Sequence, residues 1–166
     1  MTISIVTPSY NQAPFIERTL RSVLDQGYPD LQYFVQDGGS KDGTADILER
    51  HADRLAGFDC QPDGGQAQAI NRGFARTDGE IMAWLNSDDI LLPGALAHVA
   101  AKFAAHPEID VLYGHRVLID ENDCEIGRWI MPAQYHLLPG DTTHLPSRRL
   151  RVVRDYSTDI TKRGVT

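Results

Sequence analysis

The feature that most constrains the fold is a short apolar run that ends in a polar segment. The run is Ile81–Leu85, and the segment Asn86–Asp89 follows it directly. The run is too short for a helix and is continuously apolar, which predicts a strand buried on both faces of a sheet. Ligands bind at the carboxyl ends of strands in open α/β sheets, so we expect Asn86–Asp89 at a ligand-binding edge.

Two interpretations are open for the adjacent carboxylates of Asp88 and Asp89. Neighbouring carboxylates repel each other unless a cation or hydrogen-bond donors stabilise them. In the first interpretation they hold a hard metal ion, Mg²⁺ or Mn²⁺, that carries phosphate groups. In the second, Asp89 caps the following helix and Asp88 is solvated. The other polar segments of the chain favour the metal.

The composition is typical of one globular domain. The 166 residues are 42% hydrophobic and 23% charged, which suffices for a core of ordinary size. No apolar run is long enough to cross a bilayer, and the first residues lack the pattern of a signal peptide. We therefore expect a cytoplasmic protein in which Cys60 and Cys124 are reduced thiols without metal-binding spacing.

The net charge of −7 is unevenly distributed. Residues 148–166 contain six basic and two acidic side chains, a net +4, which leaves −11 on residues 1–147. An acidic body does not favour nucleic-acid binding, and a phosphorylated ligand would need a divalent cation there. The basic segment could contact an anionic membrane surface as a peripheral association, although a solvated, disordered end is the favoured interpretation.

Strands and helices alternate along the chain. Apolar and β-branched runs predict strands at 2–7, 33–35, 57–60, 81–85 and 110–113, the first ending at Pro8, which cannot donate to a ladder. The intervening segments predict helices at 14–26, 44–55, 67–75 and 93–103. This order predicts an α/β fold with a mostly parallel, Rossmann-like sheet, helices on both faces, and a small hairpin near 115–130.

Each of several polar segments directly follows a predicted strand. They are Pro8–Gln12, Asp37–Thr44, Asp63–Gln66 and Asn86–Asp89. In a parallel sheet the carboxyl ends of the strands lie on one edge, so we expect these loops to converge and to form one site.

The same segments resemble motifs of the family 2 glycosyltransferases of the GT-A fold, in the correct order and spacing. They are Ser4-Ile5-Val6-Thr7-Pro8-Ser9-Tyr10-Asn11, Val35-Gln36-Asp37-Gly38-Gly39-Ser40-Lys41-Asp42-Gly43-Thr44, Asp63-Gly64-Gly65-Gln66 and Trp84-Leu85-Asn86-Ser87-Asp88-Asp89. The resemblance implies a nucleotide-sugar donor, commonly a UDP-sugar, and transfer with inversion to a glycan or lipid-linked acceptor hydroxyl, as in polysaccharide or cell-envelope glycan synthesis.

The resemblance also implies roles for the first two motifs. Tyr10 matches the residue that lies against the nucleobase, and Pro8 and Asn11 belong to the same donor-binding motif. The alternative for Tyr10 is a core tyrosine at a strand end. Asp37 matches the first acid of a motif that often has two and that contacts the base or ribose, and Gly38 replaces the second acid. The alternative for these residues is a tight turn, for which glycine supplies the backbone freedom.

For the last two motifs, the resemblance implies contacts with the donor and its metal. Asp63, Gly65 and Gln66 fall on the donor-binding loop, although Asp63 could instead cap a helix. Asn86 stands where the family has the first acid of an Asp-x-Asp motif and can bond a ribose hydroxyl. Asp88 and Asp89 are then the ribose and metal contacts, for Mg²⁺ or Mn²⁺.

No general base can be identified in the sequence. In the family this acid belongs to an acceptor-binding half, and the chain after Gly127 does not resemble that half; Asp141 is an isolated acid in a predicted loop. We therefore expect residues 1–130 to form a nucleotide-sugar-binding GT-A domain, and residues 131–166 to be irregular, incomplete or disordered. Such a chain would bind the donor and have little transferase activity alone.

Three alternatives remain open at this point. A partner chain or a second copy in a homo-oligomer could supply the missing parts of a complete enzyme. A nucleotidyltransferase shares this type of sheet, but Pro8-Ser9-Tyr10-Asn11 lacks the glycine and basic residue that hold a triphosphate. A non-catalytic binding module would be favoured if Asp88 and Asp89 turned away from the cleft.

Overall fold

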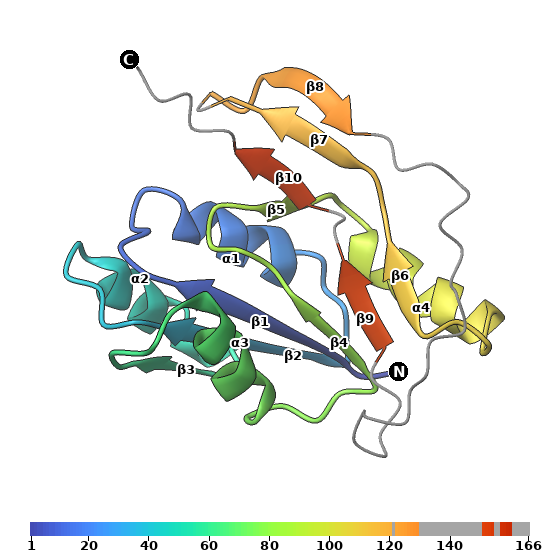
Figure 1. Ribbon diagram of the computed structural model, residues 1–166, viewed down its shortest axis with the longest axis horizontal. Helices are drawn as coiled ribbons and strands as arrows, with labels where there is room; N and C mark the ends of the chain where they lie inside the picture. The colour runs from blue at the N-terminus through green and yellow to red at the C-terminus, as the bar shows by residue number, and fades with distance from the viewer. Residues whose placement is uncertain (121, 130–150, 155–156, 161–166) are drawn as a thin grey trace.

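The computed structural model describes residues 1–120, 122–129, 151–154 and 157–160 (Figure 1). Strands and helices alternate along most of this chain, which confirms the predicted α/β class. Two sheets organise the molecule, and the larger one carries the helices.

The larger sheet is parallel between every pair of neighbouring strands. Its strand order is β3-β2-β1-β4-β9-β6, so β1 lies inside the sheet between β2 and β4. The strands are β1 (Ile3–Ser9), β2 (Leu31–Asp37), β3 (Gly57–Cys60), β4 (Ile81–Trp84), β6 (Val111–Tyr113) and β9 (Arg151–Arg154). The loops that follow β1, β2, β3 and β4 therefore leave the sheet at the same edge.

The smaller sheet lies beside the larger one in Figure 1 and has the order β5-β10-β7-β8. Its strands are β5 (Ile90–Leu91), β10 (Ser157–Ile160), β7 (Arg116–Ile119) and β8 (Glu125–Trp129). Strands β7 and β8 are antiparallel neighbours, which confirms the predicted hairpin.

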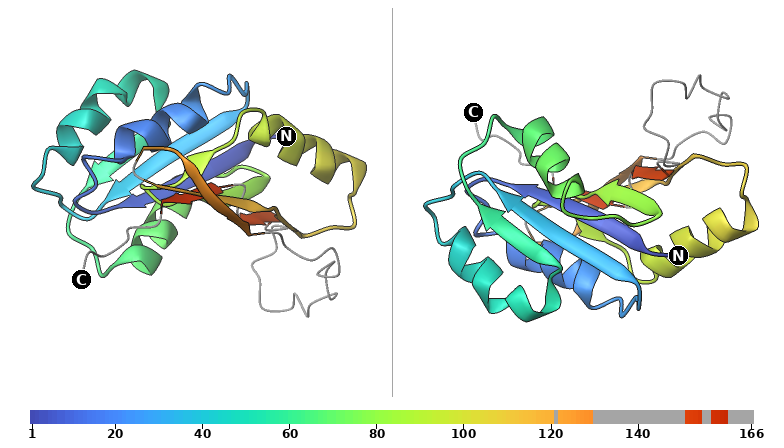
Figure 2. Two further views of the ribbon diagram at one scale, coloured as in Figure 1. Left: turned by 90° about the horizontal axis from the view of Figure 1, so that it is seen from above. Right: turned by 90° about the horizontal axis from the view of Figure 1, so that it is seen from below.

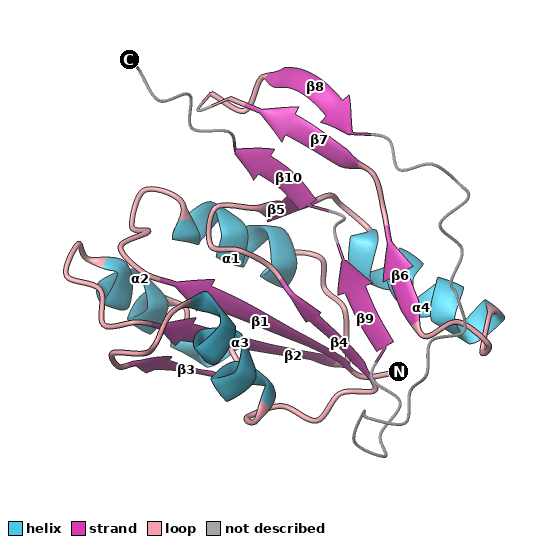
Figure 3. Cartoon of the chain, in the orientation of Figure 1, coloured by secondary structure: helices cyan, strands magenta, loops and turns pink. Residues whose placement is uncertain are grey.

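Helices cover both faces of the larger sheet (Figures 2 and 3). Helix α3 (Gln66–Phe74) lies on one face, and α1 (Ile16–Leu24), α2 (Thr44–Arg50) and α4 (Ala95–Ala105) lie on the other. A 3₁₀ helix (Ala52–Arg54) follows α2, where the sequence predicted a continuous helix. Helix α4 begins at Ala95, after Gly94 in the left-handed conformation with φ of 79°.

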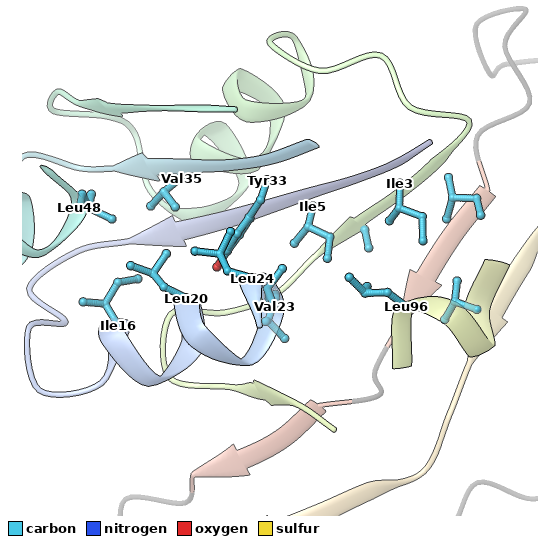
Figure 4. Close-up of a cluster of buried hydrophobic side chains, with 14 of the residues drawn as sticks. Ile3, Ile5, Ile16, Leu20, Val23, Leu24, Tyr33, Val35, Leu48 and Leu96 are labelled. Carbon is cyan, nitrogen blue, oxygen red and sulfur yellow. The ribbon is translucent and has the colours of Figure 1, made fainter. Parts of the chain in front are cut away.

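The core lies between one face of the larger sheet, formed by β1, β2 and β4, and the helices α1, α2 and α4 that cover this face (Figure 4). Ile3 and Ile5 of β1 point to this face because alternate residues of a strand share a side. Ile16, Leu20 and Val23 of α1 recur at helical spacing and are fully buried against them. Burial of this apolar surface holds α1 against this face of the sheet. It thereby also positions the loop that joins β1 to α1.

The opposite face permits an unusually close approach of α3 to the sheet. A Cβ atom added at Gly73 of α3 would clash with the methyl groups of Val6 on β1. Ala69, one turn earlier in the helix, is also buried. Small residues on α3 thus set the distance from the helix to β1 and place the amino end of α3 over the carboxyl edge of the sheet.

Strand β1 continues through Pro8 to Ser9, so the prediction that Pro8 ends it was wrong. Even-numbered residues of β1 bond toward β4, as in the bond from Leu85 N–H to the carbonyl of Val6. The pairing of β1 with β4 ends at Val6, and beyond it β1 pairs only with β2. The missing N–H of Pro8 therefore costs no ladder hydrogen bond.

Two short segments of residues 131–166 form strands in the structure. Strand β9 lies between β4 and β6, and β10 lies between β5 and β7, so residues after 150 contribute backbone to both sheets. The domain boundary expected at residue 130 remains a prediction. The rest of the predicted irregular or disordered segment, including Asp141, lies outside the described residues.

Within the described part of the chain, no helix combines the length and the apolar character that crossing a bilayer requires.

We predict that Gly73→Ala lowers the free energy of unfolding by about 1–3 kcal/mol, because the new methyl group forces α3 away from Val6. Gly127→Ala is the matched control, since a Cβ there meets only Leu118 Cδ1 at an ordinary 3.6 Å. Urea denaturation measures both variants. A Gly73→Ala protein as stable as the control would contradict the close packing of α3.

Candidate functional site: a cleft at the carboxyl edge of the sheet

One cleft of about 700 Å³ lies at the carboxyl edge of the larger sheet. Residues after β1, β2, β3 and β4 and the first turns of α3 line it together, as the predicted convergence requires. The lining residues are Pro8, Ser9, Tyr10, Gln12, Gly38, Pro62, Asp63, Gly65, Gln66, Ala69, Asn86, Ser87 and Asp88. Most of the predicted donor-binding residues are among them, but Asn11, Asp37 and Asp89 are not.

Asn11 joins the loop after β1 to the loop after β2. Its N–H donates to Ser40 Oγ at 2.7 Å, and its Oδ1 accepts the N–H of Lys41 at 3.1 Å. The residue is left-handed, with φ of 53°, a conformation that Asn tolerates better than most side chains. The structure therefore places Asn11 between the two loops, and a contact with the donor remains a prediction.

Asp42 makes a second connection between the same loops. Its Oδ2 accepts the N–H of Ala13 at 2.9 Å, and its Oδ1 accepts the hydroxyl and N–H of Thr44 at 2.6 and 3.1 Å. The hydroxyl of Thr44 makes the largest contribution to holding the pKa of Asp42 below its usual value. Asp42 is ionised at neutral pH and keeps the two loops together.

Asp37 is fully buried within its own loop. Its Oδ1 accepts Ser40 Oγ at 2.5 Å, and its Oδ2 accepts the N–H groups of Gly39 and Ser40 at 3.0 and 2.8 Å. Both carboxylate oxygens thus stabilise the turn after β2. This carboxylate does not line the cleft. A contact of Asp37 with a nucleobase or ribose therefore remains a prediction.

Tyr10, Gly38 and Asp63 lie together at one part of the cleft. The Tyr10 side chain is 62% exposed, so the alternative of a core tyrosine was wrong. A Cβ added at Gly38 would lie 3.3 Å from both Tyr10 Cδ2 and Asp63 Oδ2. The loops after β1 and β3 therefore bring an aromatic side chain and a carboxylate to the same cleft, both close to Gly38.

The start of α3 is held by a short polar turn. Asp63 Oδ1 accepts the N–H of Gly65 at 2.8 Å. The N-cap residue of α3 is Gly65, without a side-chain capping bond, so the alternative that Asp63 caps the helix was wrong. Gly65 has φ of 102°, a conformation that side chains rarely adopt. This turn places Gln66, the first residue of α3, on the wall of the cleft.

Asn86 connects that wall to the loop after β4. Gln66 Nε2 donates to Asn86 Oδ1 at 2.6 Å, and Asn86 Nδ2 donates to Asp89 Oδ2 at 3.0 Å. An amide can accept on one side and donate on the other, whereas the aspartate expected at this position could not donate to Asp89. Asparagine at position 86 therefore allows both hydrogen bonds, to Gln66 and to Asp89, at the same time.

Asp88 and Asp89 have different environments. Asp88 lines the cleft, and Asp89 is only 5% exposed and is bonded to Asn86. The alternative that Asp89 caps a helix was wrong, because β5 follows it and α4 begins only at Ala95. Of the two predicted metal ligands, the structure places only Asp88 at the cleft.

Sequence reasoning did not identify the residue that anchors this loop. Thr19 of α1 is buried, and its hydroxyl donates to the carbonyl of Ser87 at 2.8 Å. A lone threonine on an apolar helix face resembles an ordinary core residue in sequence. Ser9, Gln12, Pro62 and Ala69 were also not predicted, although they neighbour predicted site residues and line the cleft.

The donor set fits a metal that arrives with a phosphorylated ligand. No group of three or more His, Cys, Asp or Glu side chains suited to a metal occurs among the described residues. Mg²⁺ is commonly held by one or two carboxylates together with phosphate oxygens, and Asp88 supplies one such carboxylate. The cleft thus suits a metal shared with a diphosphate.

Cys60 is not among the residues that line the cleft. Burial is the main cause that raises the pKa of the Cys60 thiol to about 11, with the negative charges of Asp37 and Asp59 adding to it. The thiol is therefore neutral near pH 7. Cys124 is exposed in the hairpin region, and both cysteines are free.

Comparison with known proteins identifies the family. A model of glycosyl transferase family 2 matches residues 4–159. The chain belongs to this family. It is 33% identical over 127 residues to an uncharacterized glycosyltransferase of Nostoc sp., a match that covers 74% of this chain and 39% of that protein. It is 36% identical over 116 residues to the O-antigen biosynthesis protein RfbC of Myxococcus xanthus, covering 67% of this chain and 9% of RfbC.

Solved structures confirm the GT-A fold of this glycosyltransferase domain. The crystal structure of S. aureus TarS 1-349 has a TM-score of 0.65 at 24% identity and covers 82% of this chain and 40% of that chain. The mannosyltransferase PcManGT from Pyrobaculum calidifontis, in complex with GDP-Man and Mn²⁺, has a TM-score of 0.58 at 29% identity, covering 71% and 35%. The chain thus spans less than half the length of these proteins.

We predict that Thr19→Val lowers the free energy of unfolding by about 1–3 kcal/mol, because the buried carbonyl of Ser87 loses its partner. Thr19→Ser keeps the hydroxyl and should recover most of that loss. Urea denaturation measures the stability, and amide hydrogen exchange reports local opening at residues 86–89. Equal stability of the valine variant and the wild type would show that Thr19 does not anchor the loop.

Proposed function

We propose that this chain is the donor-binding domain of an inverting glycosyltransferase that uses a nucleotide diphosphate sugar, with a UDP-sugar as the expected donor. The observation that carries the proposal is that Tyr10, an exposed aromatic ring, and Asp88, a carboxylate, line the same cleft in a family 2 chain. A nucleobase needs a flat apolar surface, and a diphosphate needs a cation. The same cleft offers the flat ring of Tyr10 for the base and the carboxylate of Asp88 as a ligand for the cation.

The residues divide into a nucleoside part and a diphosphate part. Tyr10 and Pro8 would contact the base, because an aromatic ring stacks on a nucleobase. Asn86 and Gln66 would face the ribose or the sugar, with their bond to each other fixing both amides. Asp88 would hold Mg²⁺ or Mn²⁺ together with diphosphate oxygens. The presence of GDP-Man and Mn²⁺ in PcManGT, at 29% identity, supports this assignment.

The reaction of such a site is a direct displacement at the anomeric carbon. The acceptor hydroxyl attacks from the face opposite the diphosphate, and its proton passes to a general base. The divalent cation supplies stabilisation of the negative charge that develops on the diphosphate. The chain's own contribution is to hold the nucleotide against Tyr10 and to fix the loop of Asp88 through Thr19 and Asn86.

We further propose that transfer needs residues beyond the described cleft. The carboxylates that line the cleft, within the described residues, are Asp63 and Asp88, and both lie where the donor would bind. A general base for the acceptor is not among these lining residues. The chain alone would then bind donor and transfer little sugar, and the name of RfbC, an O-antigen biosynthesis protein, supports a glycan as acceptor.

Isothermal titration calorimetry with UDP and Mn²⁺ tests the proposal. We expect binding to the wild-type chain and a loss of at least about tenfold for Asp88→Asn, because one charged ligand of the cation is removed. Asp53→Asn, on the exposed 3₁₀ helix away from the cleft, removes the same charge and should leave the affinity unchanged. Absence of heat with any nucleoside diphosphate, for a folded wild-type chain, would end the proposal.

Tyr10 provides a second prediction. Tyr10→Ala should weaken nucleotide binding by about 10- to 100-fold, because stacking on a base contributes about 1–3 kcal/mol. Tyr10→Phe keeps the ring face and should bind nearly as tightly as the wild type. Competition titration with UDP measures both variants. Similar losses in the Phe and Ala variants would assign the role to the hydroxyl and not to stacking.

A further inference from the structure

The segment that carries Asp88 continues directly into the smaller sheet. Asp88 lines the cleft, and β5 begins two residues later, at Ile90. Strand β5 has two residues, both paired with β10, and α4 follows from Ala95. A strand this short forms few ladder hydrogen bonds, so its position depends on contacts outside the sheet. Those contacts therefore also set where Asp88 lies in the cleft.

Ser22 of α1 makes one of these contacts. Its Oγ accepts the N–H of Leu91 in β5 at 3.1 Å and donates to the carbonyl of Thr19 at 2.8 Å. The bond to Thr19 orients the hydroxyl along its own helix, which leaves a lone pair of Oγ for Leu91. Helix α1 thus holds β5 by a side-chain acceptor.

Gln26 follows the end of α1, and its side-chain amide is fully engaged. Nε2 donates to the carbonyl groups of Ser22 and Leu92 at 2.8 and 3.3 Å, and Oε1 accepts the N–H of Leu96 at 3.0 Å. Leu96 lies in the first turn of α4, whose N-cap residue Gly94 makes no side-chain capping bond. Gln26 therefore satisfies one of the free donors at the start of α4 and joins that turn to the end of β5.

Helix α1 is a firm support for this segment because its other face is packed in the core. The residues of that face are fully buried against the larger sheet: Ile16, Leu20 and Val23. The loop that leads into α1 carries Tyr10. One helix therefore positions both the aromatic ring of the cleft and, through Ser22 and Gln26, the segment that follows Asp88.

We propose that Ser22 and Gln26 are positioning residues for the cation site, which hold Asp88 where a divalent cation meets the diphosphate. The inference rests on the proposed nucleotide-binding function and adds the residues that preorganise its metal ligand. Neither residue lines the cleft, so neither would contact the donor. A carboxylate held in place before binding costs less ordering entropy than one on a loose loop. Loss of these contacts should weaken the cation-dependent part of nucleotide binding and spare the part made by Tyr10.

Isothermal titration calorimetry with UDP and Mn²⁺ compares the wild-type chain with Gln26→Met, which keeps the length of the side chain and removes its hydrogen bonds. We expect the affinity to fall about three- to tenfold, the effect of losing one net hydrogen bond from the ordered segment. Uridine has no diphosphate to share a cation. Its affinity, measured by NMR titration, should equal that of the wild type.

Gln32→Met is the matched control for loss of a partly buried amide. Gln32 Oε1 accepts the hydroxyl of Ser4 and the N–H of Asp78, each at 3.0 Å, and its Nε2 donates to Asp78 Oδ1 at 2.8 Å. Gln32 is the second residue of β2, at the edge of the sheet opposite the cleft. Urea denaturation should show both variants destabilised, whereas Gln32→Met should bind UDP with Mn²⁺ as the wild type does.

Ser22 provides an independent pair of variants. Ser22→Ala removes the acceptor for Leu91 and should weaken binding of UDP with Mn²⁺, whereas Ser22→Thr keeps the hydroxyl and should restore it. Wild-type affinity in both Gln26→Met and Ser22→Ala, an equal loss in Gln32→Met, or an equal loss for uridine would overturn the inference while the proposed function stands. Failure of the folded wild type to bind UDP with Mn²⁺ would overturn both.

Discussion

The parallel pairing of β1 with β2 and β4 is the constraint on which the site depends. It sends the loops after these strands to one edge of the sheet, and the pairing of β2 with β3 adds the loop that leads into α3. Apolar packing of α1 on one face of the sheet fixes the end of the loop after β1. The close approach of α3 on the other face fixes the end of the loop after β3. The cleft follows from this arrangement.

The acidic side chains in these loops fall into two groups. Asp37, Asp42 and Asp89 accept hydrogen bonds from the protein itself and hold the loops in place. Asp63 and Asp88 line the cleft and have oxygen atoms to offer a ligand. A dense acidic edge is tolerated because hydrogen-bond donors stabilise the first group. A divalent cation bound with a diphosphate would offset the charge of the second.

Sequence reasoning predicted the sheet, the hairpin and the convergence of the loops, because these depend on local apolar patterns and on the geometry of parallel strands. It could not predict which acids turn inward. The roles of Asn11, Asn86 and Asp89 depend on partners far away in the sequence or on the direction of one side chain. Strands β9 and β10 were missed for a similar reason: each is defined by pairing with strands far earlier in the sequence, β4 and β6 for β9, and β5 and β7 for β10.

The most direct test of the central claim is a crystal structure of the chain with uridine diphosphate and Mn²⁺. The account predicts the uracil ring on Tyr10, and the diphosphate and Mn²⁺ beside Asp88, within one cleft. A nucleotide bound elsewhere on the protein, or a cation bound away from Asp88, would contradict it.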